Sequence, residues 1–448
     1  MVEIRTIGAL GRALAARRLT AEQAVTRCIE AIEAHNPGLN AFICVLADEA
    51  LAEARRADAD LAAGRVGGAL HGVPISLKDL FDMRGVATTA ASRVREGHVA
   101  AADATVVSRL RAAGAVIVGK TNLHEFALGT TNEDSAFGPA RHPLDPTRSP
   151  GGSSGGSAAS VAAGMAYASV GSDTGGSIRI PSAACGLVGF KPTIGAVPTD
   201  GVVPLSPTMD HVGPICRSVD DAQLLFDVLR GAAPAAAAPR EARGVRLGLL
   251  RSHFMARLDP DVAAAFESAC ARLRHAGTDI VEASIPHAGD IAPIYLHIVL
   301  SEAAAYHAVT LEHRAEVYTP NVRLRLEMGR YILAEDYVRA LRGRDVLTAD
   351  VDAALADVDA LLLPALAIPA PTIGADTVRI DGADEPVRNV MLRLTQLFNI
   401  TGHPAITVPC GATPAGLPVG AQLVGRPGRD LDLLSAARAL ETHLGGPA

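Results

Sequence analysis

Two glycine-rich segments interrupt an otherwise apolar chain, and serines lie within both of them. The first reads GGSSGGS at residues 151–157 and the second reads GSDTGGSIR at residues 171–179. A third segment, GVPISLKD at residues 72–79, is an apolar run that ends in Lys78. Glycines leave backbone N–H groups unshielded, and such dense glycine is unusual in a plain connection between core elements. The pattern predicts functional loops set into a closely packed fold.

The core must be built mainly from small aliphatic side chains. The 448 residues are 49% hydrophobic but only 3% aromatic, and tryptophan is absent. Short apolar strands at 73–77 and 115–118 alternate with helical patterns such as 105–113. Buried strands that alternate with helices favour a mixed or parallel sheet that is covered on both faces. The sequence therefore predicts an α/β protein, an α/β/α sandwich around a large mixed central sheet.

Helical and strand periodicity places the other elements along the chain. Thr20 and Gln23 form a capping-box pattern at the start of a helix that we expect to stop at Asn36-Pro37-Gly38. A Pro- and Ala-rich stretch at 233–240 is expected to join two halves. The remaining expected helices are 6–17, 47–63, 157–163, 260–275, a long helical stretch over 291–357, and 430–443, and the remaining strands are 41–46, 245–250, 360–366 and 405–408.

Charge and hydropathy exclude two classes of partner. The net charge is −7, the pI is about 6.1 and no long basic block occurs, which disfavours binding to nucleic acid. No uninterrupted apolar run reaches the ~18 residues of a membrane span, and the first residues lack a signal-peptide pattern. We therefore expect a cytoplasmic protein with no membrane partner. The six cysteines lack CxxC spacing and are expected to be free thiols, with Cys185 in the core.

Three alternative sites match the sequence only in part. Ser154 is the central residue of a G-x-S-x-G pattern, but three prolines within 142–150 exclude the strand that a nucleophile elbow needs. His124-Glu125 has leucine, not histidine, at position 128, so a zincin-type metal site has no support. Neither glycine segment ends in the Gly-Lys-Ser/Thr of a phosphate-binding loop, which leaves phosphate binding as a weak alternative.

The second glycine segment can stabilise a negative charge. The amides of Thr174, Gly175, Gly176 and Ser177 are free of bulky side chains and can point toward an oxyanion. A serine nucleophile also needs a base. Lys78 ends an apolar strand, and burial there would lower the pKa of its amine and favour the neutral form. Spacing alone does not select these residues from the other polar groups of the chain.

Several segments together resemble the amidase signature family. They are the three segments above with GKTNLHEFA at 119–127, CGLVGFKPT at 185–193, GHPAITVP at 402–409 and GLPVGAQ at 416–422. The resemblance covers nearly the whole chain and is weakest over 220–390. One departure is Arg141-His142-Pro143, where many relatives have Asn-Pro; it concerns only local contacts of the loop.

This resemblance implies a role for each residue of the site. Ser177 would be the nucleophile, Ser153 would relay the proton from within a cis peptide, and Lys78 would be the base. Ser154, Asp173 and Arg179 would be supporting residues, for which a purely structural role is at least as plausible as direct catalysis. The family uses no cofactor and no metal.

The resemblance also implies a fold and an activity. It implies an amidohydrolase that acts on a small-molecule amide, with a homodimer left open because relatives are often dimers. We expect an N-terminal helical segment, 1–65, packed on an amidase signature domain, 66–448, whose region around 290–357 is variable and mostly helical. Substrate contacts are expected from 121–135 and 290–400. Candidates there are Tyr306, Tyr318, Tyr331 and Tyr337, with Arg314 or Arg388 as ligands for a substrate carboxylate.

Two other functions remain open. One is the glutaminase subunit of an aminoacyl-tRNA amidotransferase, which typically has asparagine after Lys-Asp and glutamine after the arginine of the second glycine segment. This chain has Leu80 and Ile180 at those positions, which favours a stand-alone amidase. The other is a non-catalytic binding protein on the same fold, against which the intact Lys78, Ser153 and Ser177 speak.

Overall fold

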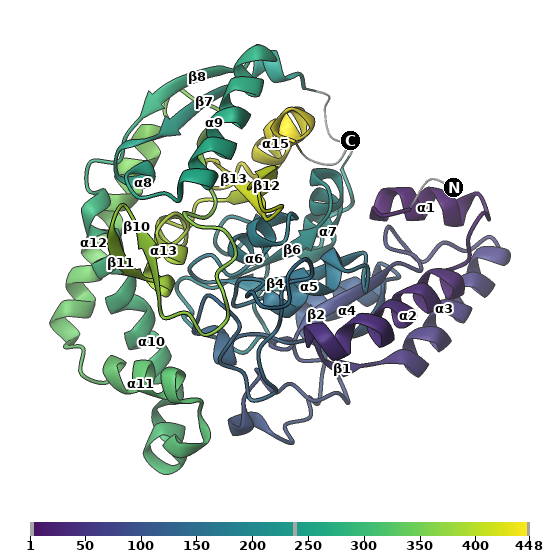
Figure 1. Cartoon of the computed structure of the whole chain (residues 1–448). Coiled ribbons are helices and arrows are strands. Elements are labelled where there is room, and N and C mark those ends of the chain that lie inside the picture. Colours follow the sequence, from purple (N-terminus) through teal and green to yellow (C-terminus); the bar gives the residue numbers. More distant parts are fainter. Residues whose placement is uncertain (1–3, 236–239, 446–448) are drawn as a thin grey trace.

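The computed structural model describes residues 4–235 and 240–445 (Figure 1). The strands are β1 (Phe42–Val45), β2 (Pro74–Lys78), β3 (Val116–Thr121), β4 (Ala168–Asp173), β5 (Val188–Lys191), β6 (His211–Cys216), β7 (Arg246–Leu250), β8 (Asp279–Ala283), β9 (Ala360–Pro364), β10 (Thr377–Ile380), β11 (Ala383–Pro386), β12 (Ala405–Ala412) and β13 (Pro418–Val424). The helices are α1 (Ile7–Ala15), α2 (Ala21–Leu39), α3 (Ala47–Ala62), α4 (Thr105–Ala112), α5 (Gly155–Ala162), α6 (Arg179–Ala184), α7 (Val219–Arg230), α8 (Ser252–Met255), α9 (Pro260–His275), α10 (Ile291–Arg314), α11 (Pro320–Gly329), α12 (Ala334–Ala354), α13 (Val387–Leu392), α14 (Leu397–Ile400) and α15 (Asp430–Leu444).

Eleven of these strands form one mixed sheet in the order β1-β3-β2-β4-β6-β5-β12-β13-β9-β7-β8. Strand β2 pairs in parallel with both β3 and β4, whereas β4 pairs antiparallel with β6. The carboxyl ends of β2 and β4 therefore lie at the same edge of the sheet. Strands β10 and β11 form a separate two-stranded ribbon.

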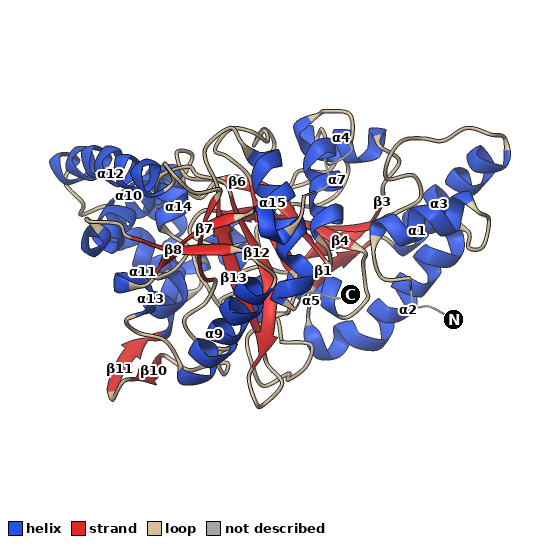
Figure 2. Cartoon of the chain, turned by 90° about the horizontal axis from the view of Figure 1, so that it is seen from above, coloured by secondary structure: helices blue, strands red, loops and turns tan. Residues whose placement is uncertain are grey.

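Helices cover both faces of the sheet, and alternate strand residues pack into different cores (Figure 2). In β9, Ala360 and Leu362 belong to one buried cluster, while Leu361 and Leu363 belong to another. Because neighbouring side chains of a strand point to opposite faces, this alternation marks a sheet that is buried on both sides. The α/β/α sandwich predicted from the sequence is confirmed.

The long helical stretch expected over 291–357 is three helices. α10 ends at Arg314, α11 begins at Pro320 and α12 begins at Ala334. Pro320 has no N–H for a preceding helix, but its fixed φ suits the first position of a new one. Figure 1 shows these helices together at one side of the sheet. By length and composition alone, the stretch Ala288–Val317 could cross a membrane, but it packs here against α11 and α12.

The expected stop at Asn36-Pro37-Gly38 is wrong. Helix α2 continues through Pro37 to Leu39 and ends at Asn40, which is left-handed with φ 49°. The capping box at its start is confirmed, since Thr20 accepts from the Gln23 N–H and the Gln23 side chain accepts from the Thr20 N–H. Pro37 removes one hydrogen bond from the last turn, but the Asn40 N–H still donates to the Asn36 carbonyl and closes the helix.

The N-terminal segment is joined to the central sheet by pairing as well as by packing. Strand β1 pairs antiparallel with β3, with Phe42 opposite Thr121. A division between 1–65 and 66–448 stays a prediction. Of the expected joining segment 233–240, residues 236–239 lie outside the described residues.

Gly156, in the first turn of α5, packs directly on the backbone of two other segments. A Cβ there would overlap the Ala41 carbonyl oxygen and lie 2.5 Å from that of Asn122. We expect Gly156→Ala to lower the free energy of unfolding by about 1–3 kcal/mol or more, because neither backbone can move independently. Urea denaturation measures this. Gly11→Ala in α1, where nothing lies within 4 Å, is the control; an equal loss in both variants would contradict the packing described.

Candidate active site

Lys78 lies where the parallel strands β2 and β4 end side by side. The register pairs Leu77 with Val170, so Lys78 and Ser172 lie near the same edge of the sheet. The side chain of Lys78 is fully buried. Its Nζ lies 2.7 Å from Ser153 Oγ and 2.8 Å from Ser172 Oγ. The pairing of these strands therefore places the Lys78 amine next to Ser153 of the first glycine-rich segment, 75 residues away in sequence.

Burial lowers the pKa of Lys78 to about 7, against the opposing charges of Asp173 and Asp210. Removal of water penalises the ammonium form more than the neutral amine. No ion pair joins Lys78 to a carboxylate among the described residues, since its two polar partners are hydroxyls. A large fraction of the amine is therefore neutral near pH 7, and a neutral amine can accept a proton from a hydroxyl.

Ser153 and Ser154 connect the two glycine-rich segments. The Gly152–Ser153 peptide bond is cis. The next residue, Ser154, donates its N–H to the Ser177 carbonyl at 3.3 Å and its hydroxyl to the Ser172 carbonyl at 3.2 Å. Ser154 thus links the two glycine-rich segments through its N–H and its hydroxyl, and these two hydrogen bonds position the segments relative to each other.

The second segment forms a turn with free amides after β4. Within the described residues, the N–H groups of Gly175, Gly176 and Ser177 donate to no acceptor. Gly176 has φ +137°, a conformation that only glycine adopts readily, and a Cβ there would overlap Thr395 Oγ1. Thr395 holds the turn in place by donating to the Gly175 carbonyl at 2.6 Å. Ser177 is almost fully buried, with 6% exposed. Three unpaired amides around a serine form a potential oxyanion hole.

Asp173 and Arg179 enclose this turn in a buried ion pair. Arg179 Nε and Nη2 donate to the two oxygens of Asp173 at 3.0 and 2.9 Å. The other donors of Arg179 reach Asn399 Oδ1 at 2.5 Å, Gln422 Oε1 at 2.6 Å and the Thr395 carbonyl at 3.0 Å. Burial opposes ionisation of Asp173, but the Arg179 charge outweighs it and holds the pKa of that carboxyl well below its usual range. Every group of the pair is engaged, which supports the structural role for both residues.

Asp210, the residue before β6, holds the start of the turn in place. It accepts from Thr174 Oγ1 at 2.6 Å and from the N–H groups of Leu205 and Ser206. Burial raises the pKa of Asp210 to about 6. A cavity of about 250 Å³, lined by Leu80, Ser172, Thr174 and Asp210 among others, lies against this corner. The cavity therefore borders Ser172, one of the two partners of Lys78.

Most of the other residues proposed from the sequence lie away from this site or have structural partners. Tyr318 is buried against Phe126 and His307, Tyr337 donates to Glu302 at 2.9 Å, and Arg314 is exposed at the end of α10. Tyr306 and Tyr331 are exposed by 43% and 84%. Arg388 differs from these, since its buried Nε has no acceptor among the described residues.

Cys185 and the His124-Glu125 pair have packing roles. The Cys185 thiol is buried, its pKa is raised by that burial, and it donates to the Pro150 carbonyl. His124 lies against Asp134, while Glu125 accepts from Thr319. No group of three or more histidine, cysteine, aspartate or glutamate side chains in residues 4–235 and 240–445 could hold a metal ion.

Five residues that shape the site were not predicted from the sequence: Ser172, Asp210, Tyr295, Thr395 and Asn399. Ser172 lies in the second glycine-rich segment. Its position two residues before the turn, on a strand beside Lys78, was the sequence signal that could have identified it. Tyr295, Thr395 and Asn399 come from segments with no motif, and they reach the turn only through the tertiary fold.

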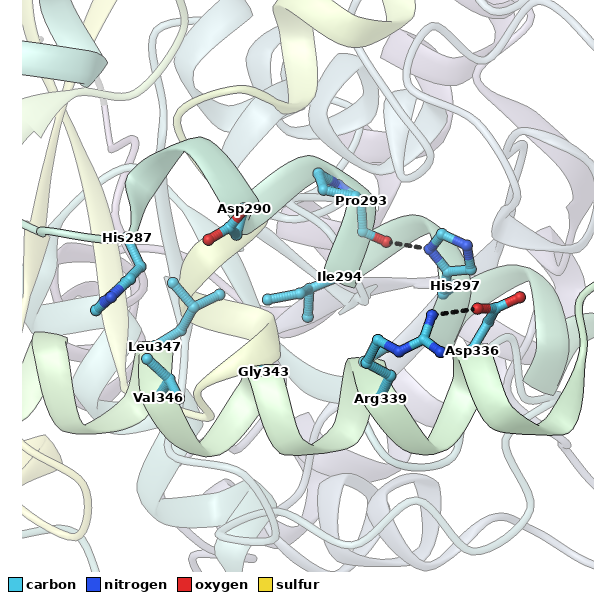
Figure 3. Close-up of a pocket in the computed structure, with 11 residues that line it drawn as sticks. His287, Asp290, Pro293, Ile294, His297, Asp336, Arg339, Gly343, Val346 and Leu347 are labelled. Carbon is cyan, nitrogen blue, oxygen red and sulfur yellow. Dashed lines mark hydrogen bonds and ion pairs between the residues drawn. The ribbon is translucent and has the colours of Figure 1, made fainter.

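A separate cavity of about 440 Å³ lies between α10 and α12 (Figure 3). His287, Ile294 and His297 line it from one side and Arg339 and Leu347 from the other. It contains none of the residues of the glycine-rich segments, so it is not part of the candidate active site.

A substitution at Asp173 tests the buried ion pair that encloses the turn. We expect Asp173→Asn to lower the free energy of unfolding by about 3–5 kcal/mol, because it leaves the buried Arg179 charge uncompensated. Urea denaturation followed by circular dichroism measures the change. Asp145→Asn, in a partly exposed pair with Arg148, is the control and should cost far less. A loss for Asp173→Asn as small as that of the control would argue against the buried pair.

Comparison with known proteins agrees with this architecture. The family model described as Amidase matches residues 23–434. The chain is 40% identical to an amidase of Pseudomonas putida over 97% of this chain and 95% of that protein. It is 37% identical to the A subunit of the glutamyl-tRNA(Gln) amidotransferase of Koribacter versatilis (strain Ellin345) over 99% of both chains. A solved amidase structure superposes with a TM-score of 0.94 at 36% identity, covering 98% of this chain and all of that one. The chain belongs to the amidase family of hydrolases, the amidase signature enzymes.

Proposed function

We propose that this amidohydrolase cleaves the carboxamide C–N bond of a small molecule through an acyl-Ser177 intermediate. The observation that carries the proposal is the 2.7 Å contact between a fully buried Lys78 amine and Ser153 Oγ. A buried, partly neutral lysine in contact with a serine hydroxyl can accept a proton from it. The neighbouring Ser154 donates its N–H to the Ser177 carbonyl, which holds Ser153 close to Ser177. Lys78, Ser153 and Ser177 would thus act as base, relay and nucleophile.

Each step conserves its protons. Ser177 Oγ attacks the amide carbon and gives its proton to Ser153, whose own proton moves to Lys78. The C–N bond then breaks while Ser153 passes a proton to the leaving nitrogen and recovers one from Lys78, because an amide anion is too basic to leave. A water molecule next attacks the ester carbon of acyl-Ser177 and gives a proton through Ser153 to Lys78. The ester C–O bond then breaks, Ser153 passes a proton to Ser177 Oγ and recovers one from Lys78, and the acid leaves.

The free amides of the turn supply the electrostatic part of the reaction. During attack, negative charge develops on the carbonyl oxygen, and the N–H groups of Gly175, Gly176 and Ser177 have no competing acceptor within the described residues. Fixed donors in a buried site stabilise that charge without reorganisation. Thr174 would contribute both its amide and, through Asp210, the anchoring of the turn.

A second candidate is the glutaminase subunit of a tRNA-dependent amidotransferase, because relatives with that name match the chain at comparable identity. Two positions support the stand-alone amidase instead. Leu80 lines the cavity beside Ser172, and Ile180 packs under Gly176, where the glutaminase subunit typically has asparagine and glutamine. Ammonia release by the purified chain alone, from glutamine and from simple amides, distinguishes the two.

The proposal includes the cellular setting. The substrate would be a small amide in the cytoplasm, with no nucleic acid or membrane as partner, and the enzyme would act alone or as a homodimer. Size-exclusion chromatography with light scattering measures the oligomeric state.

Ser177→Ala should abolish turnover and also abolish covalent labelling by a fluorophosphonate, because the nucleophilic oxygen is gone. Mass spectrometry of the labelled protein measures the second effect. Cys185→Ala removes a nearby thiol and should leave both properties intact. Labelling that persists in Ser177→Ala together with full activity would remove Ser177 from its role.

The rate should depend on pH through Lys78. Because the neutral amine is the active form and burial lowers its pKa to about 7, kcat/KM should rise about tenfold per pH unit below that value and level off above it. Initial rates from about pH 5 to about pH 9 measure this, since they cover both sides of the transition. In Lys78→Ala, any residual rate should climb with pH without that plateau. A wild-type profile that is flat across pH 7, or one unchanged by Lys78→Ala, is incompatible with lysine as the base.

A further inference from the structure

Arg388 is a cation without a partner next to the proposed site. Among the described residues it makes no ion pair and no hydrogen bond, and its Nε is buried with no acceptor. The residue as a whole is half-buried, so the guanidinium is reachable from one side. A guanidinium stays charged at any physiological pH. Leaving such a group without a partner costs free energy, unless a ligand supplies the missing acceptor.

The helix that carries Arg388 also touches the free-amide turn. Arg388 and Leu392 are four residues apart in α13 and therefore share one face of it. Leu392 Cδ2 lies 3.0 Å from the position of a Cβ at Gly175. Side chains at this spacing are about 5–6 Å apart at Cβ. Arg388 thus lies about one helical turn from the amides around Ser177.

Tyr295 links the arginine to the turn from another helix, α10. A Cβ at Gly175 would overlap the Tyr295 hydroxyl, so that hydroxyl lies directly on the turn. Burial raises the pKa of Tyr295 to about 12, and the nearby charge with the largest effect on it is that of Arg388. The phenol stays protonated and keeps an O–H donor at the same place. Two donors, a guanidinium and a phenol, therefore lie near Gly175.

The carboxylates near this space already have partners. Asp173 is paired with Arg179, and Asp210 accepts from Thr174. The neighbouring cation is Arg325, whose guanidinium donates to the Leu128 carbonyl at 2.9 Å and is affected by the opposite charge of Asp134. Asp134 itself is engaged by His124. Among the described residues, only Tyr295 counters the effect of burial on the pKa of Arg388, and it is a neutral phenol at physiological pH. An anionic ligand would satisfy both the charge and the empty donors.

We propose that Arg388, assisted by the Tyr295 hydroxyl, binds a carboxylate on the acyl part of the substrate. The proposal rests on the proposed amidase function and narrows it: the substrates are short half-amides of dicarboxylic acids, in which a few carbon atoms separate the amide from the carboxylate. A planar guanidinium fork matches the two oxygens of a carboxylate. Succinamate and glutaramate are two such half-amides and serve as probes.

Binding to an inactive variant tests the site independently of turnover. Calorimetry on Ser177→Ala should show that succinamate binds at least about tenfold tighter than the neutral butyramide, as expected for a hydrogen-bonded charge. The additional change Arg388→Gln should weaken succinamate binding by about 10- to 100-fold and leave butyramide unaffected. Arg330→Gln, which removes an exposed arginine at the end of α11, is the matched control and should change neither ligand.

Turnover by the active enzyme gives the second readout. Arg388→Gln should raise KM for succinamate or glutaramate with little change in kcat and should leave kcat/KM for butyramide unchanged, while Arg388→Lys should restore part of the loss. Equal effects on charged and neutral amides, or a wild-type enzyme without preference for the carboxylate, would overturn the proposal. If Ser177→Ala binds succinamate through Arg388 but the active enzyme hydrolyses no amide, the amidase function fails and the carboxylate site stands.

Discussion

The chemistry proposed for the site depends on keeping one buried lysine out of ion pairs with carboxylates. Two acidic residues lie close enough to affect the Lys78 amine, and both are occupied elsewhere. Asp173 is paired with Arg179 and accepts from Asn399, and Asp210 accepts from Thr174 and two backbone amides. If either carboxylate paired with the amine instead, the ammonium form would be favoured and the base would be lost. The neutrality of Lys78 is therefore a property of the whole hydrogen-bond network.

That network joins parts of the chain that are far apart in sequence. Arg179 reaches the loop at Thr395, helix α14 through Asn399 and strand β13 through Gln422. The C-terminal third of the chain thus holds the turn that carries Ser177, while the N-terminal half supplies Lys78 on β2. The segment at 416–422 is one of those that resemble the amidase signature family. It contributes Gln422, whose side chain accepts a hydrogen bond from the buried Arg179. The geometry of the proposed site and the stability of the fold therefore depend on the same contacts.

Local patterns predicted the elements well where a periodic stretch coincided with its own cap, as in α9, which Asp259 caps and Pro260 begins. They failed where tertiary packing decided, as when α2 passed through Pro37 or when 291–357 divided into three helices. The glycine-rich segments and Lys78 were visible because glycine and a lone lysine after an apolar run are unusual. Tyr295 and Thr395 carried no such signal, because only the folded sheet brings them to Gly175 and Gly176.

The lysines of this chain allow the central claim to be tested by direct titration. The sequence has three of them, Lys78, Lys120 and Lys191, and all three side chains are buried. In protein labelled with ¹³C at lysine Cε, NMR should resolve few signals, and the one that is missing in Lys78→Met belongs to Lys78. Its titration should be centred at about 7. A Lys78 signal that titrates only near the ordinary lysine value of about 10.4 would contradict a neutral base.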